Sequence, residues 1–253
     1  MPKEEAPAYL HSLQESAAAL AETLGLTYEK LTDRELNKFE VSFKRQFVMP
    51  FKEREIVDLY ERHKLEILLG AMVAKDQMKA EFDGEMPESG KFGMVRPRAA
   101  FFGIGDDWED AGTWATGSPQ NWIHSGTSLL NGTAGNPIRI GENAVHVIIA
   151  IGSLHPLPKL ESIYFKIDGK DKPVLILGDA FKKSDLKYKE LDRTFIWKKD
   201  TTVLAKVFAS ATFGSTVEDY PYLIGASFIK EEALRVHDPA DVVKPAYKII
   251  STT

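Results

Sequence analysis

The sequence predicts an α+β protein in which a helical N-terminal region precedes an antiparallel β-sandwich. In residues 1–82, apolar side chains recur every three or four positions, as they do along one face of an α-helix. In residues 137–253, short apolar runs recur roughly every 8 to 12 residues between Gly, Pro and Asp joints, which favours a sandwich over βαβ units. Residues 83–136 form an irregular belt rich in aromatic residues. We therefore predict three regions with these boundaries.

Composition and charge narrow the classes of protein to which this chain could belong. The chain has 253 residues, no cysteine and a net charge of −5. Disulfides, thiolate metal sites and cysteine nucleophiles are therefore excluded. The negative charge does not favour general nucleic-acid binding, although a local contact stays open. With neither a signal-peptide pattern nor an apolar run of about 20 residues, we expect a cytoplasmic protein without a membrane span.

Three helices are expected in the N-terminal region. Residues 6–24 carry one apolar stripe, and Gly25 follows at the position of a C-terminal glycine stop. Thr32 and Glu35 have the spacing of a capping box, which predicts a second helix that ends before Pro50. Residues 52–82 predict a long third helix with one broad apolar face, which leaves its other face free for solvent or a partner.

The strand pattern is clearest in residues 160–167, where apolar and polar residues alternate. Asp168 and Gly169 follow, and this dipeptide between two apolar runs predicts a tight hairpin to residues 172–177. The other expected strands are residues 138–140, 145–151, 194–197, 203–208 and 222–229, with residues 247–250 as a final edge strand.

The belt holds an unusual concentration of large aromatic residues. We predict that Phe102, Trp108, Trp114 and Trp122 anchor an interface, because a few aromatic residues usually dominate interface energy. The same tryptophans could instead stack on sugars, which would make the chain a carbohydrate-binding module on a sandwich scaffold. A long segment without regular periodicity is often functional under either interpretation.

An acidic run in the belt is the candidate ion-binding site. Asp106, Asp107, Glu109 and Asp110 could bind Ca²⁺ through their carboxylate oxygens. The run lacks the ligand spacing of a calcium loop, so a solvated acidic turn is the preferred interpretation. Such a turn could also pair with basic residues of another subunit.

The histidines carry the enzymatic alternative. None of the six forms a metal-binding pair at helical spacing, and the sequence contains no phosphate-binding glycine motif. A hydrolase could use His124 or His146 together with Asp106 or Asp107. His146 lies inside a strand pattern, where a buried, hydrogen-bonded histidine is more usual. We therefore expect no enzyme activity and no cofactor.

The strand rhythm and turn chemistry of residues 163–169, 203–208 and 221–228 resemble those of the jelly-roll structural proteins of virus and phage particles. The resemblance covers residues 137–250. It implies a capsid, decoration or connector subunit that assembles with its own copies or with other particle subunits and is located in the virion. The helical region would then act as an arm or base. The family has no catalytic residues to carry over, so we predict a structural, self-assembling subunit.

Overall fold

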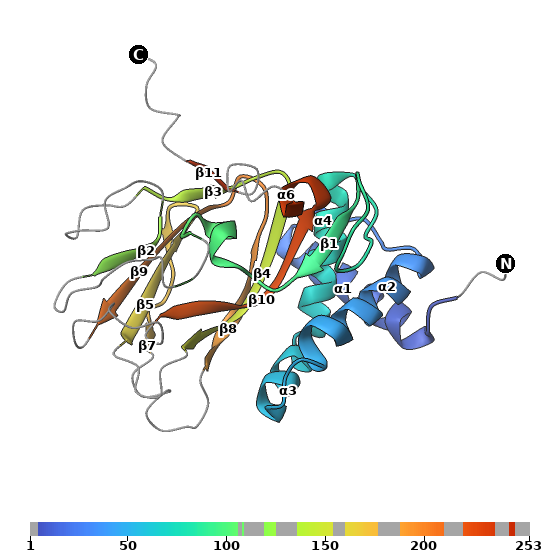
Figure 1. Cartoon of the computed structure of the whole chain (residues 1–253), viewed down its shortest axis with the longest axis horizontal. Helices are drawn as coiled ribbons and strands as arrows, with labels where there is room; N and C mark the ends of the chain where they lie inside the picture. The colour runs from blue at the N-terminus through green and yellow to red at the C-terminus, as the bar shows by residue number, and fades with distance from the viewer. Residues whose placement is uncertain are drawn as a thin grey trace, which may run out of the picture.

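The computed structural model describes residues 5–105, 108, 119–124, 136–153, 160–176, 188–209, 220–235 and 243–245. Two antiparallel sheets face each other, and a layer of helices covers the outer face of one of them (Figure 1). The predicted α+β class with antiparallel sheets is confirmed. Among the described helices, none is long and apolar enough to cross a membrane.

The helical layer is built from the first part of the chain. Its elements are α1 (Ala8–Leu24), α2 (Asp33–Phe43), the π-helical turn η1 (Lys44–Val48), α3 (Arg54–Arg62) and α4 (Lys64–Met78). The predicted capping box is confirmed, since the Thr32 amide donates to Glu35 Oε2 at 2.8 Å and the Glu35 amide donates to Thr32 Oγ1 at 3.4 Å. Gly25 ends α1 in the left-handed conformation, with φ of 64°.

The expectation of one long helix over residues 52–82 is wrong. The chain breaks at His63, whose backbone leaves the helical region (φ −97°, ψ 12°), so that α3 ends at Arg62 and α4 begins at Lys64. The expectation of a free face is also wrong, because α4 lies between α1 and the sheet and is buried on almost every side. At Gly70 an added Cβ would lie 2.3 Å from Val147 Cγ2 and 2.7 Å from Phe228 Cε2. Only glycine lets α4 approach the sheet this closely.

The sheet beneath the helices has the order β1 (Phe92–Val95), β10 (Pro221–Lys230), β4 (Ala144–Ser153) and β8 (Tyr188–Trp197). All neighbouring strands are antiparallel. Every residue of β4 is buried, because helices cover one of its faces and the second sheet covers the other. This double burial explains why residues 145–151 are almost continuously apolar, without the alternation of a strand that has one solvent face.

The second sheet has the order β11 (Val243–Pro245), β3 (Ile138–Ile140), β9 (Thr202–Ala209), β5 (Leu160–Ile167) and β6 (Lys170–Asp171), while β2 (Gln120–Ile123) also pairs with β9 and β7 (Leu175–Ile176) with β5. The predicted hairpin after β5 is confirmed. Asp168 and Gly169 both have positive φ, 51° and 72°, as a tight two-residue turn requires. The expected strand at residues 247–250 lies outside the described residues.

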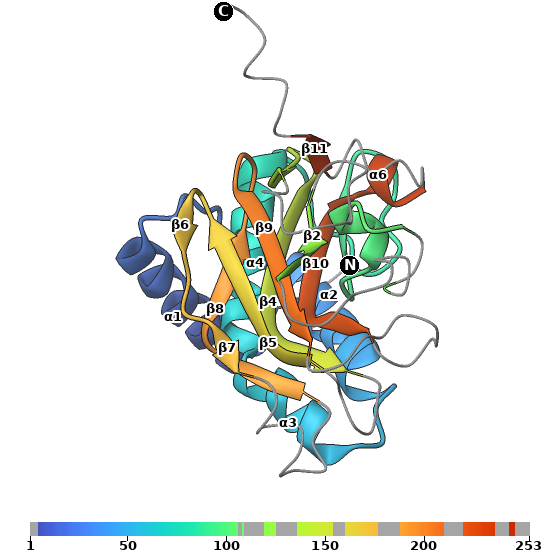
Figure 2. The ribbon, with the colours of Figure 1, turned by 90° about the vertical axis from the view of Figure 1, so that its left-hand side faces the viewer.

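Two hydrophobic cores hold the layers together. The core between the sheets contains Phe165 and Trp197, and the core between helices and sheet contains Phe39, Met72 and Phe228. Full burial of such a side chain contributes roughly 1.5–3 kcal/mol relative to exposure. The helices therefore share a core with β4 and β10, and the view in Figure 2 shows α4 running behind these strands. Two short helical segments, η2 (Ala99–Phe102) and α6 (Glu231–Arg235), flank the ends of β1 and β10.

Candidate functional site

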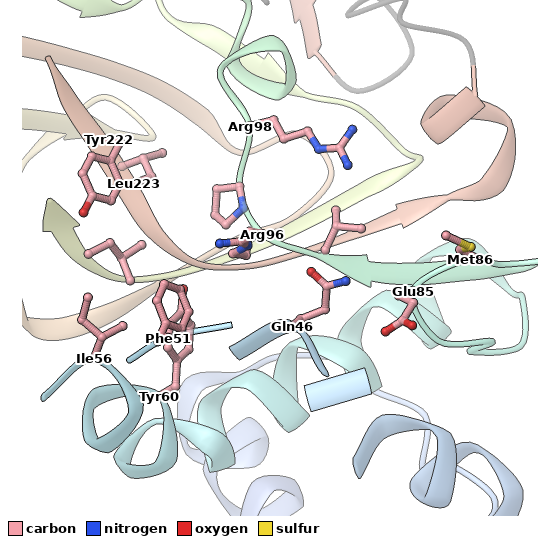
Figure 3. A pocket seen from close by; sticks show the side chains of 13 residues that line it. Gln46, Phe51, Ile56, Tyr60, Glu85, Met86, Arg96, Arg98, Tyr222 and Leu223 are labelled. Atoms are coloured by element: carbon pink, nitrogen blue, oxygen red, sulfur yellow. The ribbon is translucent and has the colours of Figure 1, made fainter. Parts of the chain in front are cut away.

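A pocket of about 490 Å³ opens at the seam between the helical layer and the first sheet (Figure 3). Its walls come from η1, α3, the segments on both sides of β1, and the first residues of β10. This volume lies in the range of small-molecule sites. The lining residues are Gln46, Phe51, Ile56, Tyr60, Glu85, Met86, Val95, Arg96, Pro97, Arg98, Tyr222, Leu223 and Ile224.

Stacked aromatic rings form the side of the pocket nearest the helices. The Tyr60 ring stacks between Phe47 and Phe51, with centroid distances of 4.6 and 5.8 Å. Its hydroxyl donates a hydrogen bond to the Gly225 carbonyl at 3.4 Å, which fixes the ring against β10. Burial raises the pKa of Tyr60, against the opposing charge of Arg96, so the phenol is neutral. The pocket thus has a rigid, uncharged aromatic wall.

A bulge in β10 shapes the opposite wall. The pairing of β10 with β4 shifts between Ile224 and Gly225. An added Cβ at Gly225 would lie 1.9 Å from the Val147 carbonyl oxygen, so the bulge needs glycine. Tyr222, three residues before Gly225, lines the pocket, and burial raises the pKa of its hydroxyl.

Two exposed arginines give the pocket a basic side where the chain leaves β1. The guanidinium of Arg96 lies 5.5 Å from the Phe51 ring centroid, and that of Arg98 lies 5.8 Å from the Phe101 centroid. Figure 3 shows Arg96 above Phe51 and Gln46, with Arg98 farther from the helices. Within the described residues, neither guanidinium has a carboxylate partner. The site therefore carries positive charge that the described residues do not offset.

The acidic residue of the pocket is already compensated. Arg45 Nη1 donates a hydrogen bond to Glu85 Oε1 at 3.1 Å and forms an ion pair with it. Figure 3 places Glu85 and Met86 at the end of the pocket away from Tyr222. The pocket is therefore basic toward Arg96 and Arg98 and close to neutral toward Glu85.

A second cluster of charges joins the α3–α4 break to β8. His63 Nε2 lies 2.8 Å from Glu190 Oε1, and His63 Nδ1 lies 3.6 Å from Glu66 Oε1. Arg62 Nη2 pairs with Glu190 Oε2 at 2.6 Å. The interaction with the Glu66 carboxylate and then the hydrogen bond with Glu190 raise the pKa of His63, while burial opposes them. This cluster ties the helices to an edge strand, so we interpret it as a structural contact.

The predicted aromatic anchors lie mostly inside the molecule. Phe102 and Trp122 are buried, with exposed fractions of 0% and 1%, because η2 and β2 turn these rings into the core between the sheets. Trp108 is partly buried, and its ring lies 5.8 Å from Phe102 and 6.1 Å from Trp122. Phe102 and Trp122 are therefore core residues and offer no platform to a partner or a sugar. Trp114 lies outside the described residues.

The predicted hydrolytic and ionic residues are not brought together by the described structure. His146 is fully buried on β4, and its Nδ1 lies 2.8 Å from Ser227 Oγ on β10. Burial lowers the pKa of His146 to about 3, so the imidazole stays neutral. The same burial keeps the side chain out of reach of a substrate. His124 follows β2, on the other sheet. The acidic residues Asp106, Asp107, Glu109 and Asp110 all lie outside the described residues.

Over the part of the chain that the structure describes, no three His, Asp or Glu side chains are grouped to hold a metal ion. The sequence also matches no protein-family model, and no curated protein sequence matches it.

The sequence did not predict the pocket, because its walls come from three distant stretches of the chain. The one local signal was Arg96-Pro97-Arg98 directly after a strand.

Proposed function

We propose that this chain is a structural, self-assembling subunit of a viral or phage particle and that its sandwich is a jelly roll. The order in which the strands pair carries this proposal. The outermost pair is β1 with β10, and the next is β2 and β3 with β9. Inside these lie β4 with β8, and then β5 with β6 and β7.

These pairs are nested and antiparallel, as they are in a single long hairpin. Among the described strands, β11, which pairs with β3 at the edge of the second sheet, is an addition outside this nesting. The hairpin is rolled so that β10 lies beside β4 in one sheet and β9 lies beside β5 in the other. Rolling a nested hairpin in this way produces the two Greek keys of a jelly roll. The pairing order supports this topology independently of any sequence resemblance.

Jelly rolls occur in capsid proteins, lectins and cupins, so the fold alone does not decide the function. In this chain the space between the sheets is filled by large side chains, including Phe102, Trp122, Phe165 and Trp197. Helices cover the outer face of the sheet formed by β1, β10, β4 and β8. These features favour a subunit that acts through its outer surfaces over one with a binding chamber between the sheets.

The outer edge of the second sheet offers such a surface. Val174 and Ile176, in and beside the short edge strand β7, are 51% and 67% exposed. An open strand edge with apolar side chains tends to pair with another chain unless it is covered. We propose that neighbouring subunits cover this edge in the assembled particle.

Negative-stain electron microscopy of the purified protein tests the assembly. We expect shells, rings or tubes from the natural chain and their loss in the double variant Val174→Lys/Ile176→Lys. The matched control is Glu161→Lys, which adds a lysine at an exposed position on the adjacent strand β5. Separate small particles from the natural chain at every concentration would contradict the proposal. So would assemblies that the double variant and the control affect equally.

A further inference from the structure

We infer that the pocket between the helical layer and the β1–β10 end of the sheet is a binding site for a small amphipathic anion with a flat apolar body and one carboxylate or similar acidic group. This inference does not depend on assembly of the chain. It follows from three properties of the pocket: its rigid aromatic wall, its basic side and its local charge balance.

The aromatic wall favours a flat apolar body. Tyr60 is held by stacking on Phe47 and Phe51 and by its hydrogen bond to Gly225. Both faces of the Tyr60 ring are therefore covered, and a ligand would meet the wall along ring edges. A wall that is already fixed loses little conformational entropy when a ligand packs against it. Offset or edge-on contacts between aromatic rings add roughly 0.5–1.5 kcal/mol beyond the burial of area. The pocket volume of about 490 Å³ accommodates a ligand with one ring and a short chain.

The basic side selects a negative charge. A guanidinium that lies over a ring uses its flat face, so the N–H donors in its plane remain able to bind an acceptor. Arg96 lies over Phe51, and Arg98 lies over Phe101. Among the described residues, no carboxylate pairs with either arginine. A ligand carboxylate near Arg96 would accept charge-assisted hydrogen bonds, which are stronger than bonds between neutral groups.

The charge of the pocket is opposite in sign to the net charge of the chain. The molecule carries a net charge of −5, yet neither arginine of the pocket has a carboxylate partner among the described residues. Glu85 is offset by Arg45, and the negative charge of Glu53 acts on Tyr222, so the two arginines of the pocket still exceed it by one positive charge. An anion therefore fits the site better than a cation or a neutral molecule of the same shape.

Isothermal titration calorimetry with 4-phenylbutanoate and 4-phenylbutan-1-ol tests the inference, because the two probes share a ring and chain and differ in the acidic group. We expect one site per chain for the acid and binding of the alcohol that is roughly tenfold weaker. Arg96→Gln and Arg98→Gln should each weaken binding of the acid several-fold without affecting the alcohol. High salt should also weaken binding of the acid, because both guanidinium groups are exposed.

Two further variants serve as controls. Arg34→Gln removes an exposed arginine of α2 outside the pocket lining and should leave binding of the acid unchanged. Ile56→Trp places a larger side chain in the pocket wall and should reduce binding of both probes, with circular dichroism to verify folding. The inference is overturned by equal binding of acid and alcohol, by no binding at millimolar concentration, or by no effect of the two arginine variants. It is also overturned if the arginine variants lower the mass of an assembly while the acid does not bind, because the arginines then contact a second copy of the chain.

Discussion

The ammonium group of Lys75 on α4 donates a hydrogen bond to the Glu35 carboxylate on α2 at 2.8 Å, inside the helical layer. The same carboxylate accepts hydrogen bonds from the amides of Thr32 at 2.8 Å and Phe82 at 2.9 Å. Lys75 also donates to the Lys30 carbonyl at 3.0 Å. The two side chains are only 10% and 4% exposed. One buried ion pair thus joins α2, α4 and the chain that enters β1.

Glu35→Ala should lower the free energy of unfolding by about 3 kcal/mol, the lower end of the range for a broken buried ion pair, because it leaves the buried Lys75 with only the half-exposed Glu29, at 3.4 Å, as a carboxylate partner. Glu15→Ala is the matched control, since Glu15 pairs with Lys30 at the surface and such exposed pairs contribute little to stability. Urea unfolding followed by circular dichroism measures both variants. Equal losses of stability in the two variants would contradict the larger contribution of the buried pair.

Gly70→Ala should separate α4 from the sheet, because the added methyl group would collide with Val147 and Phe228. Overpacking of this kind typically costs about 1–3 kcal/mol. Ser16→Ala in α1, at an exposed position, is the control and should change stability by less than about 0.5 kcal/mol. Thermal unfolding measures both changes. A Gly70→Ala variant as stable as the natural chain would rule out the close contact between helix and sheet.

The pH dependence of stability should show His63 as a group that stabilises the fold most at low pH. Glu66 and Glu190 raise the pKa of His63, so the folded state binds the proton more tightly than the unfolded chain does. The stabilisation of the fold by His63 is complete below its pKa in the unfolded chain, about 6.5. It is lost as the pH rises through the pKa of His63 in the folded state. His63→Gln should therefore cost more stability at pH 5.5 than at pH 8. An equal cost at both pH values would contradict the linkage.

His146 should act in the opposite direction. Burial lowers its pKa to about 3, so only the unfolded chain takes up a proton as pH falls below about 6.5. Its stabilising effect is complete above that pH and is lost on acidification. Between pH 7 and pH 5, the loss of stability should be smaller in His146→Phe than in the natural chain by about 2 kcal/mol. A slope unchanged by the substitution would mean that His146 is accessible to protons in the folded state.

The features that could be predicted from sequence depend on residues close together in the chain. The hairpin at Asp168-Gly169 and the capping box of Thr32 and Glu35 are local, and both are present as expected. The break at His63 was missed because its partner Glu190 is 127 residues away and no helix-breaking residue marks the position. A tertiary contact overrides a helical pattern in such a case.

The site was less predictable than the fold because distant residues create it. Arg96 and Tyr222 line one pocket only after β1 and β10 have paired. The sequence predicts Phe102 and Trp122 as interface anchors, because they lie in the irregular, Gly-rich belt of residues 83–136. Their burial depends on where η2 and β2 lie relative to the two sheets, and periodicity over a few residues carries no information about that position.

Sedimentation velocity of the natural chain over a wide range of concentrations tests the central claim most directly, because it measures the mass of the species in solution. The proposal that this chain is a self-assembling subunit predicts discrete species with masses that are multiples of 28.3 kDa and that increase with concentration. A single species of 28.3 kDa at every concentration would contradict it.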